Sequence, residues 1–454
     1  MAQRAPVTRS SERRSRPARI SLVLLASVAL TTAGACGGSS HSHGGSSTAD
    51  CSVAGENAQI LATMESWYFW DKNLPANVDP SAYPSPDALL DALRYQPLDR
   101  FSFITTKSAD QAFYGAGQYV GFGIGIEIPS TNDAIDVTRS FPDSPAANAG
   151  LDRGDRITAI NGVSVATLIQ QNQLETALAA GQPGVNVALT YLDLAQAEHQ
   201  VTLTSAVITQ PSVGTLSILK AGTSTVGYLP FDSFIDTSNA ALDAAFAQLA
   251  AAGATELILD ERYNGGGEIS VAQHLASLIA GSSVTGKPFV NLTYNDQHQK
   301  QNQTFDFKTV DGALGLSRLL VITTNSTASS SELLINGLRP YLDVVTVGDT
   351  TFGKPVGENG FDVCSDVLYP MTFQITNADG AGDYFDGLPA TCAAGDDLTH
   401  ALGDPNESSL AEALAYVRTG SCGVTTSAEA RALAKSGHSR TPASYGWRRL
   451  VGGY

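Results

Sequence analysis

The chain is poor in positive charge. Its 454 residues include 27 lysines and arginines against 44 aspartates and glutamates, which gives a formal net charge of −17. A protein that binds nucleic acid normally carries a basic surface, so we expect no nucleic-acid partner. The sequence also lacks an internal apolar run long enough to cross a membrane. Its apolar content of 43% is ordinary for a globular protein, and its length predicts two or three domains.

The first 50 residues have a composition of their own. Residues 1–20 contain six arginines and one acid, and the apolar stretch SLVLLASVAL and several small residues follow before Cys36. This order predicts a signal peptide over residues 1–36. The letters AGAC resemble the bacterial lipoprotein box. On that interpretation Cys36 is lipidated and is the only membrane anchor, and residues 37–50 are a flexible tether. The alternative is plain export, with Cys36 lost at a nearby cleavage site.

Histidine and cysteine are scarce as well. The seven histidines lie apart, except for His41 and His43 in the predicted tether, and the spacings of the four cysteines after Cys36 fit no zinc site. We therefore expect no metal and no other cofactor. Four cysteines remain without Cys36, and an even number in an exported chain predicts two disulfides, with three pairings open. We expect Cys364–Cys392, which would close a glycine- and aspartate-rich loop. We also expect Cys51–Cys422, which would tie the N-terminal helices to the last core helix.

Hydrophobic patterns divide the remaining chain into four parts. A helical stripe and several prolines mark the first part, and short strands mark the second. In the third, strands alternate with helices, which predicts an α/β layer with a largely parallel sheet. The last part has no periodicity and is predicted to be a mobile tail. The expected parts are an N-terminal helical region (51–112), a small β-rich domain (113–208), the α/β core (209–425) and the tail (426–454).

The second part resembles a PDZ domain. The resemblance rests on GFGIGIE and on SPAANAGLDRGDRITAINGVSV, which follows the helix, turn and strand succession of that fold. It implies that the backbone around Gly121, Phe122, Gly123 and Ile124 binds the carboxylate of a chain terminus, with the peptide added as a strand. Phe122 and Ile124 would form the pocket for an apolar last residue. The alternative is a glycine-rich turn in an ordinary small β domain.

Three motifs lie at the ends of successive core strands. In LILDERYNGGGEIS, Asp260 ends a strand and the glycines at 265–267 precede a helix, whose first amides can hold an anion. In VITTNSTASSSELLINGL, Ser329 and Glu332 have the spacing of a capping box, and most such serines only cap. A serine on a strand-to-helix turn is also a typical exposed nucleophile. In VVTVGDTTFGKPVGE, Lys354 follows a strand, where a lone lysine is normally a solvated charge.

Together the motifs resemble the carboxyl-terminal processing peptidases, also called tail-specific proteases, in order and approximate spacing. The resemblance covers roughly residues 113–360 and implies a ClpP/crotonase-like core with an inserted PDZ domain. It assigns the nucleophile to Ser329 and the general base to Lys354, 25 positions later. The amides of Ser330 and Gly267 would form the oxyanion hole, with Gly266 the next candidate. Such a mechanism needs no histidine and no metal.

The sequence departs from the family pattern at three positions. Pro340 stands where some members have aspartate, Pro355 where glycine commonly follows the lysine, and Glu358 where others have glutamine. Glu358 would orient Lys354, but a nearby carboxylate also favours the charged form of a lysine. In the alternative, Pro355 redirects the loop and Glu358 points into solvent.

These observations lead to two main hypotheses. The first is an exported serine endopeptidase of the bacterial envelope or periplasm, acting on unfolded or C-terminally exposed proteins and peptides. The second is a non-catalytic peptide- or ligand-binding lipoprotein on the same fold. A third, a calcium-binding scaffold, would use Asp379, Asp383 and Asp386 in NADGAGDYFDG. Their spacing matches no known metal loop, and such aspartates usually make turns.

Overall fold

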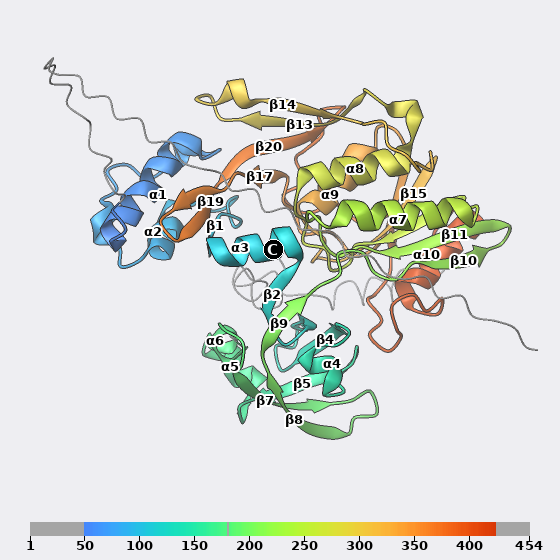
Figure 1. Cartoon of the computed structure of the whole chain (residues 1–454), viewed down its shortest axis with the longest axis horizontal. Coiled ribbons are helices and arrows are strands. Elements are labelled where there is room, and N and C mark those ends of the chain that lie inside the picture. The colour runs from blue at the N-terminus through green and yellow to red at the C-terminus, as the bar shows by residue number, and fades with distance from the viewer. Residues whose placement is uncertain (1–49, 179–180, 424–454) are drawn as a thin grey trace, which may run out of the picture. The chain divides into compact units, whose positions relative to one another are not determined.

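A computed structural model describes residues 50–178 and 181–423 (Figure 1). The predicted signal peptide with Cys36, the predicted tether up to residue 49 and the predicted tail lie outside these residues. Among the helices of the described residues, none is both long and apolar enough to span a membrane.

The centre of the fold is a six-stranded sheet. In spatial order its strands are β10 (Ser217–Ala221), β11 (Ser224–Pro230), β12 (Glu256–Asp260), β15 (Arg318–Thr323), β16 (Asp343–Gly348) and β21 (Cys392–Ala393). All neighbouring pairs are parallel except the β10–β11 hairpin. The predicted α/β core with a largely parallel sheet is therefore confirmed. Its strands read as continuous apolar runs, such as LILD and LLVIT, because both faces of the sheet are covered.

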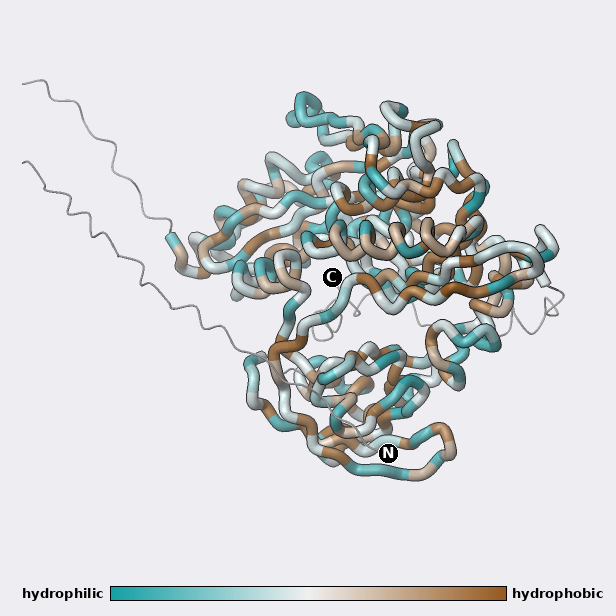
Figure 2. Tube along the Cα trace, turned by 45° about the vertical axis from the view of Figure 1, so that its right-hand side comes forward, coloured by the Kyte–Doolittle hydropathy of each residue, from teal (hydrophilic) through white to brown (hydrophobic). Residues whose placement is uncertain are grey.

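Helices cover the two faces. The four helices are α7 (Ser238–Ala251), α8 (Ile269–Ala280), α9 (Ser330–Leu338) and α10 (Ser408–Thr419). α8 contacts both α7 and α9, and Figure 1 shows the three helices side by side. They share a large apolar cluster with Leu259 and Val321 of the sheet. The neighbouring residues Ile258 and Leu320 point to the other face, where they pack with α10. Figure 2 shows hydrophobic stretches along these core strands.

A second sheet of four antiparallel strands was not predicted. Its strands are, in spatial order, β14 (Gln303–Asp306), β13 (Pro288–Tyr294), β20 (Met371–Asn377) and β17 (Val356–Glu358). Leu292, Phe373 and Ile375 from this sheet enter the same apolar cluster as α8 and α9. Both β13 and β20 contact α9. The sheet therefore forms an apolar wall beside the helix that the serine cluster begins.

The N-terminal region is built into the core. Its main elements are α1 (Val53–Trp67), α2 (Pro86–Leu93) and β1 (Phe103–Thr106), with short 3-10 turns at Asp71–Asn73 and Pro80–Ala82. β1 pairs with β19 (Asp366–Tyr369), which pairs in turn with β18 (Phe361–Val363). Ile60 and Met64 of α1 are buried in one cluster with Val356 and Met371. These residues pack against the segment that carries Lys354.

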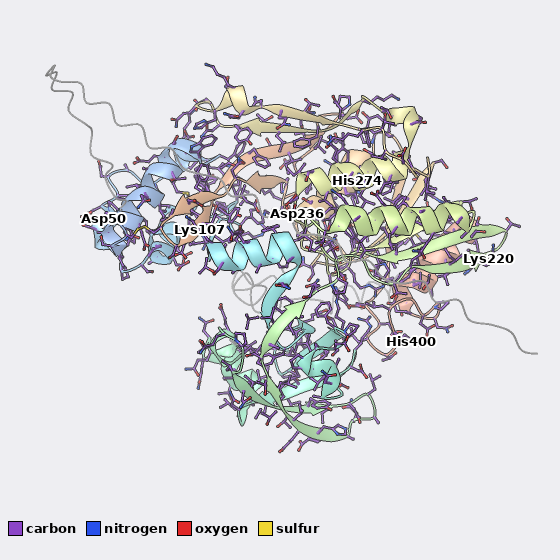
Figure 3. All side chains as sticks on the ribbon, in the orientation of Figure 1. Asp50, Lys107, Lys220, Asp236, His274 and His400 are labelled. Carbon is purple, nitrogen blue, oxygen red and sulfur yellow. A yellow bond between two sulfur atoms is a disulfide. The ribbon has the colours of Figure 1, made fainter. Side chains whose placement is uncertain are left out.

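Residues 118–209 form the inserted domain. α3 (Lys107–Ala116), which begins at the labelled Lys107 in Figure 3, leads into it. A two-stranded ribbon connects it to the core: β2 (Gln118–Gly121) and β9 (Ala206–Thr209). Its sheet contains, in order, β3 (Ile124–Glu127), β4 (Ile135–Ser140), β5 (Arg156–Ile160), β7 (Asn186–Leu192) and β8 (Glu198–Thr204), with β6 (Val163–Ser164) paired to β5. The helices are α4 (Pro145–Asn148), α5 (Val165–Gln170) and α6 (Leu174–Leu178). The domain has an apolar cluster of its own.

Two apolar stretches of this domain are divided between elements. The run YVGFGIGIEI forms β2 and β3, because the chain turns at Gly123, which has a φ of 76°. Residues 165–178 form α5 and then α6. Asn172, between them, has a φ of 54°, which is incompatible with a continuous helix.

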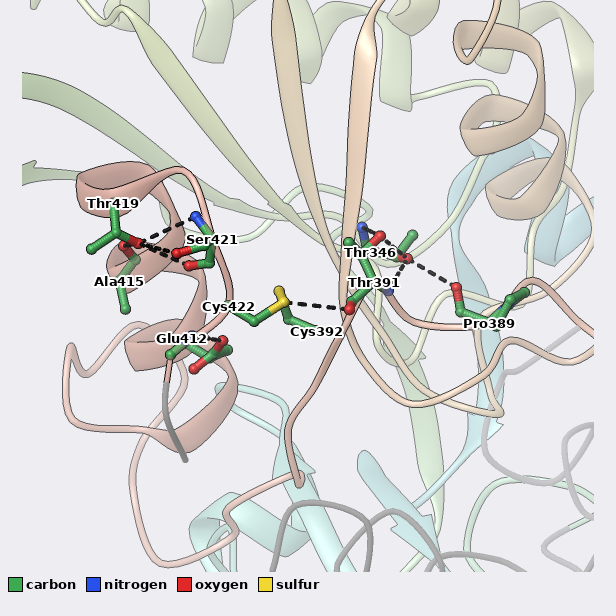
Figure 4. Close-up of a disulfide and its surroundings, with 10 residues drawn as sticks. Thr346, Pro389, Thr391, Cys392, Glu412, Ala415, Thr419, Ser421 and Cys422 are labelled. Atoms are coloured by element: carbon green, nitrogen blue, oxygen red, sulfur yellow. Dashed lines mark hydrogen bonds between the residues drawn. A yellow bond between two sulfur atoms is a disulfide. The ribbon is translucent and has the colours of Figure 1, made fainter. Parts of the chain in front are cut away.

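The predicted disulfide pairing is wrong. The structure joins Cys51 to Cys364 and Cys392 to Cys422. Cys364 lies in the turn between β18 and β19, the two strands to which β1 of the N-terminal region is added, so it faces the start of α1. Cys392 is in β21 at the edge of the central sheet. Figure 4 shows its bond to Cys422, just after α10, with Glu412 of that helix beside it.

Candidate active site

Ser329 lies at the turn from β15 into α9, in a conformation that is unusual for serine. Its φ is 54° and its ψ is −116°, and the helix begins at the next residue. A non-glycine residue in this region is strained, and such strain is concentrated at functional sites. Gly266 packs directly against it, since a Cβ on that glycine would lie 2.7 Å from the Ser329 Cβ. The two motifs SSSE and NGGG therefore meet, as the resemblance implied.

Glu332 connects the serine to the lysine loop. One carboxylate oxygen, Oε2, accepts hydrogen bonds from the amides of Ser329 (3.0 Å) and Lys354 (2.8 Å). The other, Oε1, accepts from the Thr351 hydroxyl (2.5 Å) and the Gly353 amide (2.7 Å). Burial raises the pKa of this carboxyl, and the four donated bonds oppose that shift. The glutamate of the capping box thus fixes the backbone of both predicted catalytic residues.

Lys354 is buried, contrary to the solvated charge that a lone surface lysine would be. The residue stands in the loop that joins β16 to β17, and its side chain is 6% exposed. The ammonium Nζ donates a hydrogen bond of 2.8 Å to Glu358 Oε1. Glu358 therefore faces Lys354, and the alternative in which it points into solvent is wrong. A charged side chain in such a place is normally paired, and here the glutamate is one partner.

The oxyanion-hole candidates differ in what their amides bind. The Gly266 amide donates to the Asn264 side chain at 2.9 Å, so it is already used. Within the described part of the chain, the amides of Gly267 and Ser330 have no acceptor. Gly267 has a φ of 134°, and a Cβ there would lie 2.1 Å from the Phe234 carbonyl oxygen. Only glycine fits this position, and its amide stays available to a ligand beside Ser329.

A cavity of about 450 Å³ opens next to the serine. Ser329, Ser330 and Gly267 line one end of it, and Glu358 lines it as well. The second sheet supplies an apolar wall, formed by Leu292, Phe305, Phe373 and Ile375. An extended chain lying across Ser329 can place a side chain in this space.

A buried ionic network supports the strand end that precedes the glycines. Asp260 ends β12 and accepts from Arg262 Nε at 2.9 Å, and Arg262 also binds both oxygens of Glu407 at 2.9 Å. Asp396 accepts from Arg262 at 2.7 Å and from Arg153 of the inserted domain at 2.5 Å. Burial alone would raise the pKa of Asp396, but the two guanidiniums hold it at about 2. These buried groups are all paired, as buried ionic groups must be.

The inserted domain contacts the same segment at a second place. Arg139 forms a salt bridge of 2.5 Å with Asp232, which follows β11. Its guanidinium also lies 5.0 Å from the ring centre of Tyr263. Tyr263 stands two residues before the first glycine of the triplet, so the two domains meet close to the oxyanion candidates.

The predicted carboxylate-binding residues, Gly121, Phe122, Gly123 and Ile124, are all buried. Gly121 belongs to the β2–β9 ribbon, where it is the register partner of Ala206. Phe122 and Ile124 are buried in the apolar cluster of the inserted domain. β3 is an outer strand of its sheet, the kind of edge to which a peptide can be added.

The aspartate-rich segment forms turns around Asp379. The Asn377 side chain accepts hydrogen bonds from the amides of Asp379 and Ala381, and the Gly380 amide donates to the Asn377 carbonyl. This is the turn role that such residues usually have.

Comparisons with known proteins agree with this geometry. Residues 55–103 match the peptidase S41 N-terminal domain, residues 137–193 match the PDZ domain, and residues 225–382 match peptidase family S41. Residues 225–382 therefore belong to peptidase family S41. It is 30% identical over 252 residues to the carboxyl-terminal-processing protease of Synechocystis, which covers 54% of this chain and 56% of that protein.

Other relatives extend the same picture. A chloroplastic C-terminal processing peptidase of Tetradesmus obliquus is 29% identical, with 51% of each chain covered. The chain thus spans about half the length of the curated relatives it matches. The crystal structure of a putative S41 protease from Bacteroides fragilis is 25% identical, with a TM-score of 0.63, over 80% of this chain and 97% of that one. This S41 fold includes the N-terminal region and the PDZ domain.

Two functional contacts were not predicted. Glu332 was expected to cap α9, and its SxxE spacing gave no sign that it also holds the lysine loop. Arg100, in the N-terminal region, donates hydrogen bonds to the same loop. No sequence signal pointed to that contact, because Arg100 lies 252 and 253 positions before its partners Phe352 and Gly353.

Proposed function

We propose that the protein is an exported serine endopeptidase that uses Ser329 as the nucleophile and Lys354 as the general base. The observation that carries the proposal is the Glu332 carboxylate, whose Oε2 accepts from the amides of both residues. It holds the backbone of the strained serine, which lines the cavity, and the backbone of the buried lysine on one carboxylate. Catalysis needs such a fixed geometry between nucleophile and base.

The chemistry follows from the two side chains. Neutral Lys354 Nζ takes the proton of the Ser329 hydroxyl as its Oγ attacks the peptide carbonyl carbon. The negative oxygen of the tetrahedral intermediate lies between the amides of Gly267 and Ser330. The protonated lysine then gives its proton to the leaving amine, and an acyl-enzyme remains. Lys354 next takes a proton from water as the water oxygen attacks the ester carbon, and it returns that proton to Ser329 Oγ as the ester C–O bond breaks. Removing one oxyanion donor costs about 2.7–4 kcal/mol in such enzymes.

The substrates are unfolded or C-terminally exposed proteins and peptides, and the PDZ domain engages their C-termini. The protein works outside the cytoplasm, in the bacterial envelope or periplasm, attached to a membrane through Cys36. Support for the PDZ role comes from the outer strand β3, and support for export comes from the signal-like N-terminus.

A second candidate is a non-catalytic binding protein on the same fold. It is favoured by the salt bridge between Lys354 and Glu358, because a carboxylate at 2.8 Å stabilises the ammonium form, which is not a base. The buried lysine and the strained serine favour the enzyme.

The two candidates are separated by degradation of an unstructured protein. Wild type should cleave it, whereas Ser329→Ala and Lys354→Ala should show only background cleavage. Ser331→Ala is the matched control, because the Ser331 hydroxyl donates to the Asn264 carbonyl and takes no part in the chemistry. It should keep much of the activity. Full activity of folded Ser329→Ala would exclude this mechanism, and inactive wild type would favour the binding protein.

A further inference from the structure

The loop before Lys354 is held by the core through its amides. Residues 349–355 connect β16 to β17 without regular structure. The Thr351 amide donates to the Leu388 carbonyl and the Phe352 amide to the Thr327 carbonyl. The amides of Gly353 and Lys354 donate to Glu332. The donors of this loop are therefore satisfied from the side of the peptidase core.

Two carbonyls of the same loop are satisfied from the N-terminal region. Arg100, between α2 and β1, donates from Nη2 to the carbonyls of Phe352 (3.0 Å) and Gly353 (3.1 Å). The same nitrogen lies 3.0 Å from the Phe385 carbonyl, to which it also donates. The guanidinium carbon lies 4.6 Å from the ring centre of Phe101 and 5.1 Å from that of Phe352. One cationic group thus joins two segments of the core at the residues just before Lys354.

The chemistry of this contact requires an arginine. Hydrogen bonds from a charged donor are stronger than neutral ones, and the planar guanidinium also stacks on aromatic rings. Gly353 brings the segments close, since a Cβ there would lie 2.3 Å from the Phe385 carbonyl oxygen. A lysine ammonium could donate to the same carbonyls, but it has no flat face, so it cannot also reproduce the stacking on the two rings.

We propose that Arg100 is a positioning residue that holds the lysine loop, so that the N-terminal region completes the active site. The inference rests on the proposed peptidase function. Arg100 acts through the backbone: with Glu332 on the amides and Arg100 on the carbonyls, Gly353 is bound from both sides, which fixes the backbone from which the Lys354 side chain extends. A base displaced by about 1 Å loses roughly 100-fold in rate.

The test compares Arg100→Met and Arg100→Lys with Arg94→Met. Arg94 belongs to the same region, but it donates to the Ser102 carbonyl and to Asp91, not to the lysine loop. In full-length protein cleaving one peptide, Arg100→Met should lower kcat by about 100-fold with KM within about twofold. Arg100→Lys should lie between Arg100→Met and wild type, and Arg94→Met should stay near wild type. Thermal unfolding of each variant reports whether the fold is intact.

Hydrogen exchange provides a readout that does not depend on activity. Peptides that contain residues 350–355 should exchange faster in Arg100→Met than in wild type, and should be unchanged in Arg94→Met. A wild-type kcat in folded Arg100→Met, or unchanged exchange in the loop, would overturn the inference. So would an equal loss of kcat in Arg94→Met. If wild type cleaves nothing, the proposed function fails, and the exchange of the loop still decides whether Arg100 holds it. Should Arg100→Met not fold, Arg100→Lys carries both measurements.

Discussion

The proposed mechanism requires a neutral Lys354, and two features of its surroundings act on its charge. Burial of Lys354 disfavours its ammonium form, because a charge loses hydration there. The Glu358 carboxylate, 2.8 Å from Nζ, acts in the opposite direction. A general base must be unprotonated at working pH, so this pair decides how alkaline the medium has to be.

We expect Glu358→Gln to move the acidic limb of the kcat/KM profile to lower pH. Glutamine keeps a hydrogen-bonding oxygen near Nζ, and it removes the negative charge that stabilises the ammonium. The measurement is cleavage of one peptide by wild type and variant across the pH range in which both are folded. Glu198→Gln, on the exposed side of β8, is the control for the loss of one negative charge. An unmoved limb would mean that Glu358 does not set the charge of Lys354.

At the residue scale, sequence motifs were more informative than sequence positions taken singly. The 25-residue spacing identified Ser329 and Lys354, and the structure brings their backbones to one carboxylate oxygen. Their catalytic roles stay predictions. The use of the Gly266 amide by Asn264 was not visible in the triplet of glycines, because a turn shows its hydrogen bonds only when folded.

Among the elements, β3 carries a carboxyl group with an unusual environment. Glu127, its last residue, has a pKa raised to about 8, first by burial and then by Asp396, Asp136 and Asp349, with Arg153 acting in the opposite direction. Its ordinary value is 4.5. Between these two values the folded protein binds the proton that the unfolded chain has lost, so stability falls as pH rises through this window.

Glu127→Gln should therefore stabilise the protein most at alkaline pH. The gain is on the order of a few kcal/mol at pH above about 8, and it shrinks toward pH 5, where the native carboxyl is already neutral. Tm of wild type and variant, measured at about pH 5 and pH 8.5, gives the difference at each end of the window. The same Tm difference at both pH values would show that Glu127 does not titrate in this window. Glu198→Gln again serves as the control.

The strength of each hydrophobic pattern decided which elements were predicted. Helices α7 to α9 and the parallel strands were predicted because both faces of the sheet are buried and the strands are almost entirely apolar. The second sheet was missed because strands such as β14 (QTFD) and β17 (VGE) are short and show no alternation. Their pairing with β13 and β20 is decided by packing on α9, which the local sequence does not encode.

For the whole molecule, the proposed role of the PDZ domain predicts that the protein distinguishes chain ends from chain interiors. We expect tighter binding of a peptide with a free C-terminus and an apolar last residue than of its C-terminally amidated form, since backbone amides would bind the carboxylate. Catalytically inactive Ser329→Ala avoids turnover during titration of the two peptides. Equal affinities would refute carboxylate capture and would leave the peptidase chemistry untouched.

Disulfide pairing also belongs to this scale, and the sequence could not provide it. Four cysteines allow three pairings, and the choice depends on which loops meet after folding. Adding β1 to β19 brings Cys51 to Cys364, and the end of α10 brings Cys422 to β21.

The Cys51–Cys364 bond closes a covalent ring of the chain, because the two residues are 313 positions apart in sequence. Within this ring lie the PDZ domain, the strands β2 and β9 that connect it to the core, and Ser329. A single cut at any peptide bond between the two cysteines opens the ring without releasing a fragment. The nicked protein keeps its full mass until a reductant is added. A cut in this part of the chain by any protease therefore releases no smaller fragment on a non-reducing gel, and the two pieces stay joined through the disulfide.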